Sequence, residues 1–288
     1  MIRTYGLSKT YGATAALDEV NLNVARGSIY GLVGPNGAGK TTLLGVLSGL
    51  RTATAGSVEI DTDRIAVLPD TPHFDPWLTA REVVDLARVL GTNSSRDVDQ
   101  LLELTGIADA ADRAVGGFSR GMLQRLGLAA TLVGDPDLVL LDEPCSALDP
   151  LGRREVLDLI ARLRGEATVV FSSHILADVQ EVCDTVGILR LGKLIFEGRL
   201  EELLVGEAVP HYLVRLRAPL DPVIARLSGV AWIRDVEVVD PELIRVTATS
   251  LGAAESALVA ELTAAGAQVV SLGPEAPSLE DVFLEVVR

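Results

Sequence analysis

Short apolar runs alternate with segments of helical character along the first part of the chain. The runs at residues 29–33, 138–141 and 168–171 are apolar, as expected of parallel strands that are buried on both faces. Helices are predicted at residues 43–47, 79–90, 96–105, 108–113, 122–132 and 153–164. Strands that alternate with helices in this way predict an α/β fold.

The remaining elements of this part are shorter. Strands are predicted at residues 2–5, 20–24, 56–60 and 64–69, and a hairpin of residues 185–191 and 193–197 turns about Gly192. Thr79 and Glu82 form a capping box at the start of a helix that Gly91 ends. The helices between about residues 79 and 132 form an insert between strands, so we expect a helical subdomain beside a mixed sheet.

A change of composition at residues 206–210 predicts a domain boundary, with one domain at 1–205 and a second at 206–288. In the second part, strands are predicted at 212–216, 230–239, 243–248 and 268–272, and helices at 221–227, 253–265 and 278–286. The order β-α-β-β-α-β is that of a ferredoxin-like domain. Because no catalytic residue types cluster there, we interpret it as an interaction or regulatory module.

One glycine-rich loop lies between the first buried strand and a helix. It fits the pattern G-x-x-x-x-G-K-[ST] of a phosphate-binding P-loop. Its glycines allow backbone N–H groups to turn toward a polyphosphate, and the helix N-terminus favours the same anion. Lys40 adds a positive charge, and the Thr41 hydroxyl is a ligand for Mg²⁺. The predicted phosphate-binding residues are Gly34, Pro35, Asn36, Gly37, Ala38, Gly39, Lys40, Thr41 and Thr42.

Polar side chains follow two other buried strands at their carboxyl ends. Asp142 and Glu143 end one run, and His174 follows the next strand. Open α/β sheets bind ligands at this edge. In a P-loop protein, Asp142 is expected to contact Mg²⁺ directly or through one of the ion's other ligands, and Glu143 to orient or deprotonate the attacking water. A histidine in such a position has a structural alternative, but the shared crevice favours a functional role.

Two further residues remain open on spacing alone. Ser119 is predicted to cap the helix that follows it, and that helix start is a second potential anion site. Most serine caps serve only their own helix. Tyr11 could stack on a purine, or it could pack in the core.

Composition narrows the classes of function. The net charge of −15 argues against general affinity for nucleic acid, which needs clustered Lys and Arg. The apolar content of 48% excludes disorder, and no apolar stretch approaches the length of a membrane span. The N-terminus has no secretory signal pattern, so we expect a cytoplasmic location. The two cysteines, Cys145 and Cys183, indicate neither a disulfide framework nor a zinc site.

Over residues 2–204, these motifs together resemble the nucleotide-binding subunits of ATP-binding cassette (ABC) transporters, in the order of that family. Residues 34–42 match Walker A, and residues 138–142 match Walker B, followed by Glu143 as the catalytic glutamate. Residues 118–122 resemble the Leu-Ser-Gly-Gly-Gln signature, and residues 146–149 the D-loop. His174 falls on the switch histidine, and Tyr11 on the aromatic residue that stacks on adenine. The resemblance implies ATP and Mg²⁺ as cofactors.

Two departures from the family pattern concern glutamines. Asp70 stands where the Q-loop glutamine is usual, and we predict that it contacts Mg²⁺ through water. The signature departs at Phe118, Arg120 and Met122 but retains Ser119 and Gly121, which the family uses to cap the γ-phosphate. Met122 cannot form the hydrogen bonds of glutamine, which implies weaker nucleotide-driven closure.

The C-terminal part resembles the extra domain of bacterial multidrug and antibiotic-type ABC exporters, whose subunits act with a separate membrane permease. The resemblance implies a dimer of two cassettes, with each ATP between one P-loop and the other chain's Ser119 and Gly121. It also implies hydrolysis by Glu143 with His174, at the inner face of the membrane. Residues 79–132 and the segment after Asp70 would contact the permease, with Phe74 and Trp77 as candidate contacts.

A soluble ABC-type ATPase that acts on ribosomes or nucleic acid is the alternative. Such proteins generally carry two cassettes or a long coiled coil between the Walker motifs, and this sequence has one P-loop and no heptad run. A cassette that does not hydrolyse ATP is opposed by the presence of both Glu143 and His174.

Overall fold

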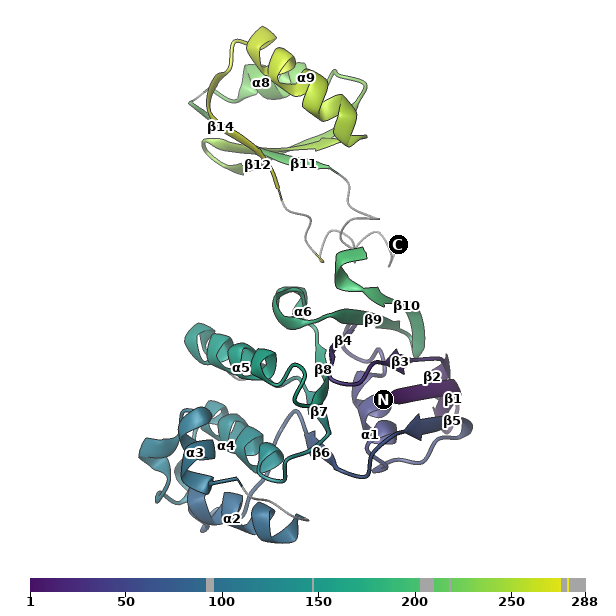
Figure 1. Cartoon of the computed structure of the whole chain (residues 1–288). Helices are drawn as coiled ribbons and strands as arrows, with labels where there is room; N and C mark the ends of the chain where they lie inside the picture. The colour runs from purple at the N-terminus through teal and green to yellow at the C-terminus, as the bar shows by residue number, and fades with distance from the viewer. Residues whose placement is uncertain (92–95, 147, 203–209, 218, 276–278, 280–288) are drawn as a thin grey trace. The chain divides into compact units, whose positions relative to one another are not determined.

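A computed structural model describes residues 1–91, 96–146, 148–202, 210–217, 219–275 and 279 of the chain (Figure 1). The chain divides into two compact units, the first of residues 1–200 and the second beginning at Glu201. The predicted boundary at residues 206–210 and the predicted last helix at 278–286 lie almost entirely outside the described residues.

The first unit is organised around a six-stranded sheet in the order β10-β9-β4-β8-β7-β6. All neighbouring strands are parallel except β9 and β10. Every residue of β4, β7 and β8 is buried, which confirms the prediction of central strands from their apolar runs. The strands are β4 Ile29–Val33, β6 Ile65–Leu68, β7 Leu138–Asp142, β8 Thr168–Ser173, β9 Thr185–Arg190 and β10 Lys193–Arg199.

A second sheet, of four antiparallel strands, lies against the first unit's core. It contains β1 Ile2–Tyr11, β2 Thr14–Val20, β3 Asn23–Val24 and β5 Ala55–Ile60. The predicted strand limits were wrong here, because β1 continues to Tyr11 and forms a hairpin with β2. Register shifts between Leu7 and Lys9 and between Lys9 and Thr10 interrupt the alternation of buried and exposed positions, so the pattern hid the strand.

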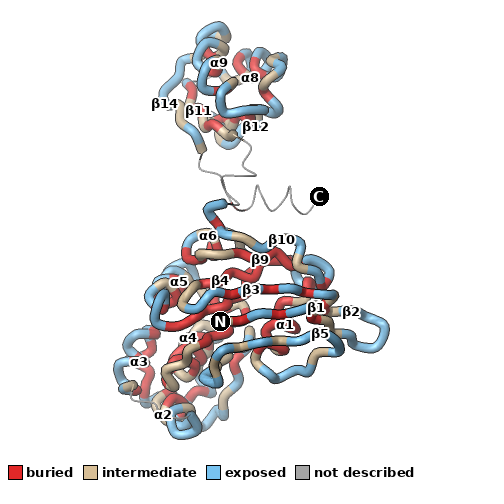
Figure 2. Tube along the Cα trace, turned by 45° about the vertical axis from the view of Figure 1, so that its right-hand side comes forward, coloured by how far each residue is buried: buried red, intermediate tan, exposed pale blue. Residues whose placement is uncertain are grey.

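The core of this unit fills the space between the two sheets around helix α1 (Lys40–Leu47). Leu43, Leu44 and Leu47 of that helix pack with Leu32 of β4 and Leu140 of β7. In Figure 2, the central strands are buried along their length. The P-loop therefore begins on a buried strand and ends on a buried helix, and both hold it rigidly.

Helices α2 (Ala80–Leu90), α3 (Val98–Leu104) and α4 (Arg120–Leu132) gather at one end of the first unit (Figure 1). The capping box of Thr79 and Glu82 is confirmed in both directions. The predicted helix at residues 108–113 was wrong in kind, because that segment forms a short 3₁₀ turn at Ala108–Ala110, and a second 3₁₀ turn follows at Val115–Gly117. Two further helices, α5 (Pro150–Arg162) and α6 (Leu176–Val182), follow in the chain.

The predicted hairpin about Gly192 connects β9 and β10. Leu191 and Gly192 both have positive φ, at 48° and 80°, which is the requirement of a two-residue type I′ turn. The N–H of Gly192 donates to the carbonyl of Ala38 at 2.9 Å. This turn therefore supports the P-loop from the side.

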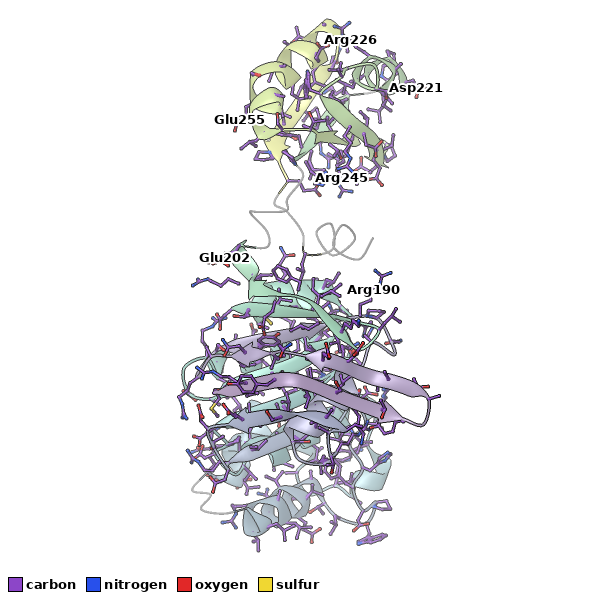
Figure 3. The ribbon with its side chains drawn as sticks, turned by 90° about the vertical axis from the view of Figure 1, so that its right-hand side faces the viewer. Arg190, Glu202, Asp221, Arg226, Arg245 and Glu255 are labelled. Atoms are coloured by element: carbon purple, nitrogen blue, oxygen red, sulfur yellow. The ribbon has the colours of Figure 1, made fainter. Side chains whose placement is uncertain are left out.

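The second unit has the predicted ferredoxin-like order. Its antiparallel sheet runs β12-β13-β11-β14. Arg226 of α8 forms an ion pair with Glu261 of α9 at 2.9 Å, and Arg245 lies on the sheet (Figure 3). The elements are β11 His211–Arg217, α8 Asp221–Leu227, β12 Ile233–Asp240, β13 Leu243–Ala248, α9 Leu251–Ala264 and β14 Gln268–Pro274.

Two general predictions concern the cysteines and membrane spans. Cys145 and Cys183 are both free and buried. Burial raises the pKa of the Cys145 thiol to about 12, so the thiol stays protonated at neutral pH. Within the described part of the chain, every helix is too short or too polar to cross a bilayer.

Candidate functional site

The P-loop connects β4 to α1 with a tightly enclosed backbone. Gly39 precedes the helix with φ of 112°, a conformation that disfavours other residues. A Cβ atom at Gly39 would lie 2.4 Å from the carbonyl oxygen of Ala16, and one at Gly34 would lie 2.3 Å from that of Leu189. The spacing of glycines in the motif therefore reflects close contact with β2 and β9.

Lys40 is buried, with 6% of its surface exposed, and its ammonium is fully engaged by the loop. Its Nζ donates to the carbonyl of Gly34 at 2.7 Å and to that of Pro35 at 3.4 Å. It also forms an ion pair with Glu143 Oε1 at 3.3 Å. The three oxygen partners hold the buried ammonium in place. An anion with charged oxygens, which form stronger hydrogen bonds than carbonyls do, can bind to it there.

The carboxyl ends of β7 and β8 meet at the same edge, as the sequence predicts. His174 Nδ1 lies 2.8 Å from Glu143 Oε2, so the Glu143 carboxylate contacts Lys40 with one oxygen and His174 with the other. The backbone of Glu143 has φ of 48°, which is uncommon for a residue with a side chain. The side chain of Glu143 is 15% exposed, so this charge is held at the rim of the site rather than in open solvent.

Ser172 is a site residue that the sequence analysis did not assign. Its hydroxyl donates to Asp142 Oδ1 at 2.6 Å and accepts the N–H of Glu143 at 2.9 Å. It therefore holds both carboxylate residues at the end of β7. A hydroxyl side chain directly after the apolar run of a buried strand, at its carboxyl end, was the available signal.

A pocket of about 270 Å³ collects most of these residues. Asp70 and Glu143 reach it from two different strand ends, and Ala16 of β2 forms part of its wall. Gly34 and Pro35 are not among the lining residues, but their carbonyls accept hydrogen bonds from Lys40, which lines the pocket. The predicted loop residues that line it are Asn36, Gly37, Ala38, Gly39, Lys40, Thr41 and Thr42.

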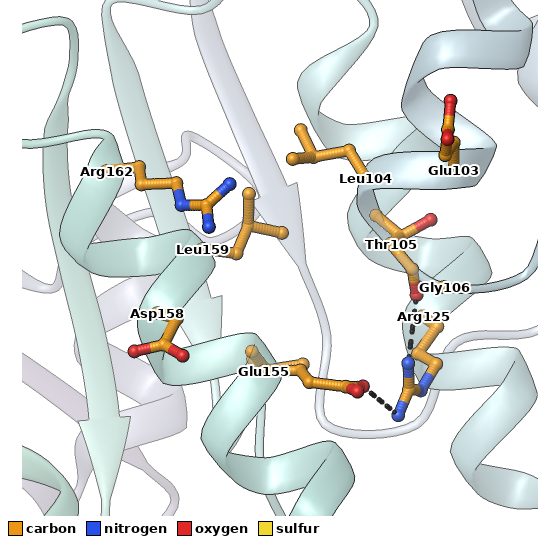
Figure 4. Close-up of a pocket in the computed structure, with 10 residues that line it drawn as sticks. Glu103, Leu104, Thr105, Gly106, Arg125, Glu155, Asp158, Leu159 and Arg162 are labelled. Carbon is orange, nitrogen blue, oxygen red and sulfur yellow. Dashed lines mark hydrogen bonds and ion pairs between the residues drawn. The ribbon is translucent and has the colours of Figure 1, made fainter.

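A larger hollow, of about 440 Å³, lies elsewhere (Figure 4). It lies between α3, α4 and α5, and Arg125 crosses it to Glu155 at 2.8 Å. None of the P-loop residues lines it. The P-loop pocket is therefore not the larger of these two hollows.

Asp70 lies 46% exposed after β6, with partners from two other segments. Ser146 donates its hydroxyl to Asp70 Oδ1 at 3.1 Å, and an Arg120 nitrogen lies 3.8 Å from the same oxygen. Arg120 belongs to the signature-like segment and Ser146 to the D-loop-like segment. The Asp70 carboxylate therefore connects the segment after β6 with the signature-like and D-loop-like segments. The positions of Arg120 and Ser146 in the sequence do not predict these contacts.

Ser119, Gly121 and Met122 lie at the start of α4, outside the residues that line the P-loop pocket. Ser119 accepts the N–H of Met122 at 3.2 Å, so the predicted N-cap is confirmed. Ser119 is nevertheless exposed, which leaves this helix start accessible to another molecule.

Tyr11 ends β1 and is 47% exposed, so the core alternative for this residue is wrong. Its hydroxyl accepts from Arg51 Nη1 at 3.0 Å. The same nitrogen donates to Thr42 Oγ1, at 3.3 Å, in the P-loop. Tyr11 is thereby connected to the P-loop pocket although it does not line it.

The pocket does not contain a complete protein cage for a metal. Among the described residues, no group of three or more His, Cys, Asp or Glu side chains has a geometry that could hold an ion. Mg²⁺ usually takes only one or two protein ligands and keeps waters and phosphate oxygens for the rest. The Thr41 hydroxyl and the carboxylates of Asp70 and Asp142 are oxygen donors of the kind that Mg²⁺ prefers, and they fit a site in which one or two of them contact the ion and waters complete its coordination.

Comparison with known proteins identifies the family. Residues 17–146 match the family model described as ABC transporter, and residues 209–287 match the C-terminal domain of DrrA1-3-like ATP-binding proteins. The chain is 35% identical to the uncharacterized ABC transporter ATP-binding protein YxlF of Bacillus subtilis, over 100% of both proteins. This chain belongs to the ABC transporter family. It is the ATP-binding subunit of an ABC transporter and an ABC-type ATPase.

Two further relatives extend the comparison of this ABC subunit. The bacitracin transport ATP-binding protein BcrA of Bacillus licheniformis is 35% identical, over 100% of this chain and 97% of that protein. A dimeric post-hydrolysis structure of the ATP-binding cassette MJ0796, bound to ADP and phosphate, aligns with a TM-score of 0.64 and 26% identity. That alignment covers 69% of this chain and 99% of the solved one. The family assignment made from the motifs is therefore confirmed.

Proposed function

We propose that the ABC subunit binds Mg²⁺·ATP in the P-loop pocket and hydrolyses it with Glu143 as the general base. The observation that carries this proposal is the position of the Glu143 carboxylate, between Lys40 at 3.3 Å and His174 at 2.8 Å, in the pocket lined by the P-loop. ATP phosphates would compete with Glu143 for the Lys40 ammonium. Binding of ATP would thus release one carboxylate oxygen to accept a proton from water, while His174 keeps the other oriented.

Mg²⁺ would be held by the Thr41 hydroxyl, with Asp142 and Asp70 acting on its waters. Asp142 is 4% exposed and already accepts a hydrogen bond from Ser172, which favours an indirect role through water. Asp70 is exposed at the pocket and has two partners that an ion could displace. The bound ion would neutralise charge on the β- and γ-phosphates.

Replacing Asp70 with asparagine should raise the Mg²⁺ concentration for half-maximal ATPase activity by about 10-fold, because an oriented carboxylate next to the ion is lost. A Mg²⁺ titration of steady-state turnover measures this shift. Asp75→Asn, at an exposed position of the same segment, is the matched control. Arg120→Gln removes the ion pair with Asp70 but keeps the Asp70 carboxylate, so it separates the two effects. Unchanged turnover and Mg²⁺ dependence in Asp70→Asn would remove Asp70 from the metal site.

The active form would be a head-to-tail dimer in which Ser119, Gly121 and the Met122 backbone of one chain cover the ATP of the other. The start of α4 supports this role because it is exposed and carries the free N–H groups of a helix N-terminus. The second copy would be either identical or related. Residues 1–205 would bind and hydrolyse ATP, and residues 206–288 would form an accessory or regulatory domain.

A membrane permease would dock on the apolar hollow beside α2. This hollow, of about 430 Å³, is formed by the segment after Asp70 together with α2 and α4. Leu86 and Leu90 of α2 are 49% and 77% exposed, and Trp77 nearby is 71% exposed. Apolar side chains gathered on one exposed face are typical of an interaction surface. Residues that line the hollow are His73, Phe74, Asp75, Leu78, Val83, Leu86, Ala87, Leu90 and Ala130.

The assembled transporter would export an antibiotic or drug-like compound, with this subunit at the cytoplasmic face of the membrane. The named similarity to a bacitracin transport protein and to DrrA-like C-terminal domains supports this class of cargo. Cargo contacts would belong to the permease, because the pocket of this subunit is filled by nucleotide.

The experiment is affinity purification of the tagged full-length chain from detergent-solubilised native membranes in the presence of ATP. We expect a polytopic membrane protein to be recovered with it. Leu90→Glu should lower this recovery by about 10-fold, because it places a charge in the docking surface. Val259→Glu, on the exposed side of α9, is the control. Recovery only with ribosomes or nucleic acid would favour a soluble ABC-type ATPase instead.

A further inference from the structure

The segment that follows α1 holds Tyr11 at two points. Arg51 Nη1 donates to the Tyr11 hydroxyl at 3.0 Å. The Lys9 ammonium lies 5.1 Å from the centroid of the Tyr11 ring and donates to the carbonyl of Thr52 at 2.7 Å. Arg51 and Thr52 are neighbours in the chain, so one short segment supports both the hydroxyl and the cation over the ring.

The path of the Arg51 side chain depends on a glycine in α1. A Cβ atom at Gly45 would lie 2.8 Å from Cδ and 3.0 Å from Nε of Arg51. The N–H of Arg51 also donates to the carbonyl of Gly45 at 2.8 Å. The guanidinium therefore crosses the helix over Gly45 and reaches the P-loop residue Thr42 as well as Tyr11.

We propose that Arg51 is a positioning residue that fixes the Tyr11 ring for stacking on the nucleobase of ATP. The inference rests on the proposed ATP site. Half of the Tyr11 surface is exposed, and without Arg51 the ring is free to change rotamer. A base that stacks on a fixed ring loses less side-chain entropy than a base that must first order the ring. The Lys9 ammonium covers one face, so the base uses the opposite face.

The same arginine also contacts the P-loop. Arg51 hydrogen-bonds Tyr11 and Thr42 with a single nitrogen. An alternative role, in which Arg51 only supports the P-loop through Thr42, would affect any polyphosphate to the same extent. The two roles therefore differ in their dependence on the base.

The test compares ATP with inorganic tripolyphosphate, which has no base, by titration calorimetry of the full-length chain. Arg51→Met should weaken ATP binding by about 3- to 10-fold and leave tripolyphosphate binding unchanged. Arg51→Lys should lie between the wild type and Arg51→Met, because it retains the positive charge and one donor nitrogen but not the planar guanidinium. Arg3→Met removes an exposed arginine of the same antiparallel sheet, and it controls for the change in net charge.

Tyr11→Leu completes a double-mutant cycle. We expect Tyr11→Leu to weaken the binding of ATP but not that of tripolyphosphate. The double variant Tyr11→Leu with Arg51→Met should bind ATP no more weakly than Tyr11→Leu does. Equal weakening of ATP and tripolyphosphate by Arg51→Met would overturn the proposal, as would full additivity in the cycle. Failure of the wild-type chain to bind either ligand would instead contradict the ATP site itself.

Discussion

We expect Glu143→Gln to lower the ATP turnover of this subunit by a factor of about 10² to 10⁴, the range that a positioned general base contributes. The physical reason is that glutamine keeps the shape of the side chain and its hydrogen bonds but cannot accept the proton of the attacking water. ATP binding should be retained or become tighter. In the free protein Glu143 forms an ion pair with Lys40, and the substitution frees that cation for phosphate.

Steady-state phosphate release measures the turnover of this variant, and titration calorimetry measures its affinity for ATP. Glu166→Gln, at an exposed position after α5, is the control for loss of one carboxylate and should behave as the wild type. Turnover within a few fold of the wild type would exclude Glu143 as the base. Loss of ATP binding together with turnover would indicate that Glu143 acts by maintaining the pocket.

Lys40→Met should weaken ATP binding by at least about 100-fold, because two or more charge-assisted hydrogen bonds to phosphate would be lost, at about 1.5 kcal/mol or more each. Methionine retains the length and apolar stem of the buried lysine, so the core around α1 should remain packed. The loss should be equally large for tripolyphosphate, in contrast to the base-dependent effect expected of Arg51→Met.

Calorimetric titration with both ligands checks this prediction, and thermal unfolding of the variant checks its fold. Lys193→Met is the matched control, because the Lys193 side chain is 65% exposed and forms a surface ion pair with Asp18. An affinity for ATP close to that of the wild type would mean that the ammonium stays on the loop carbonyls and Glu143 when nucleotide binds.

The strands and helices that could be predicted are those in which apolar residues recur at regular positions or in an unbroken run. The run of β7 is buried at every position, and Gly192 marks the turn between β9 and β10. The hairpin of β1 and β2 could not be predicted in the same way. Its register shifts and exposed positions remove the periodic signal, and the pairing with β5 and β3 depends on residues far along the chain.

The same distinction between local and distant contacts applies to the residues of the functional site. Residues within one motif could be named from the sequence, since a P-loop needs glycines, a lysine and a hydroxyl at set spacing. The partners between motifs could not be named. Ser146 and Arg120 meet Asp70 from positions 76 and 50 residues away in the sequence, and Arg51 meets Tyr11 across 40 residues.

The sequence by itself determined the family of this protein, the order of its elements, the P-loop and the carboxylates at the strand ends. These depend on local spacing, on backbone freedom at glycine and on runs of burial, all of which can be read over a few residues. Only the tertiary structure decided which carboxylate oxygen contacts Lys40 and which contacts His174, and that Arg51 joins Tyr11 to the P-loop. The physical reason is that hydrogen bonds and ion pairs act over about 3 Å, and that proximity is created by strand order and helix packing rather than by distance along the chain.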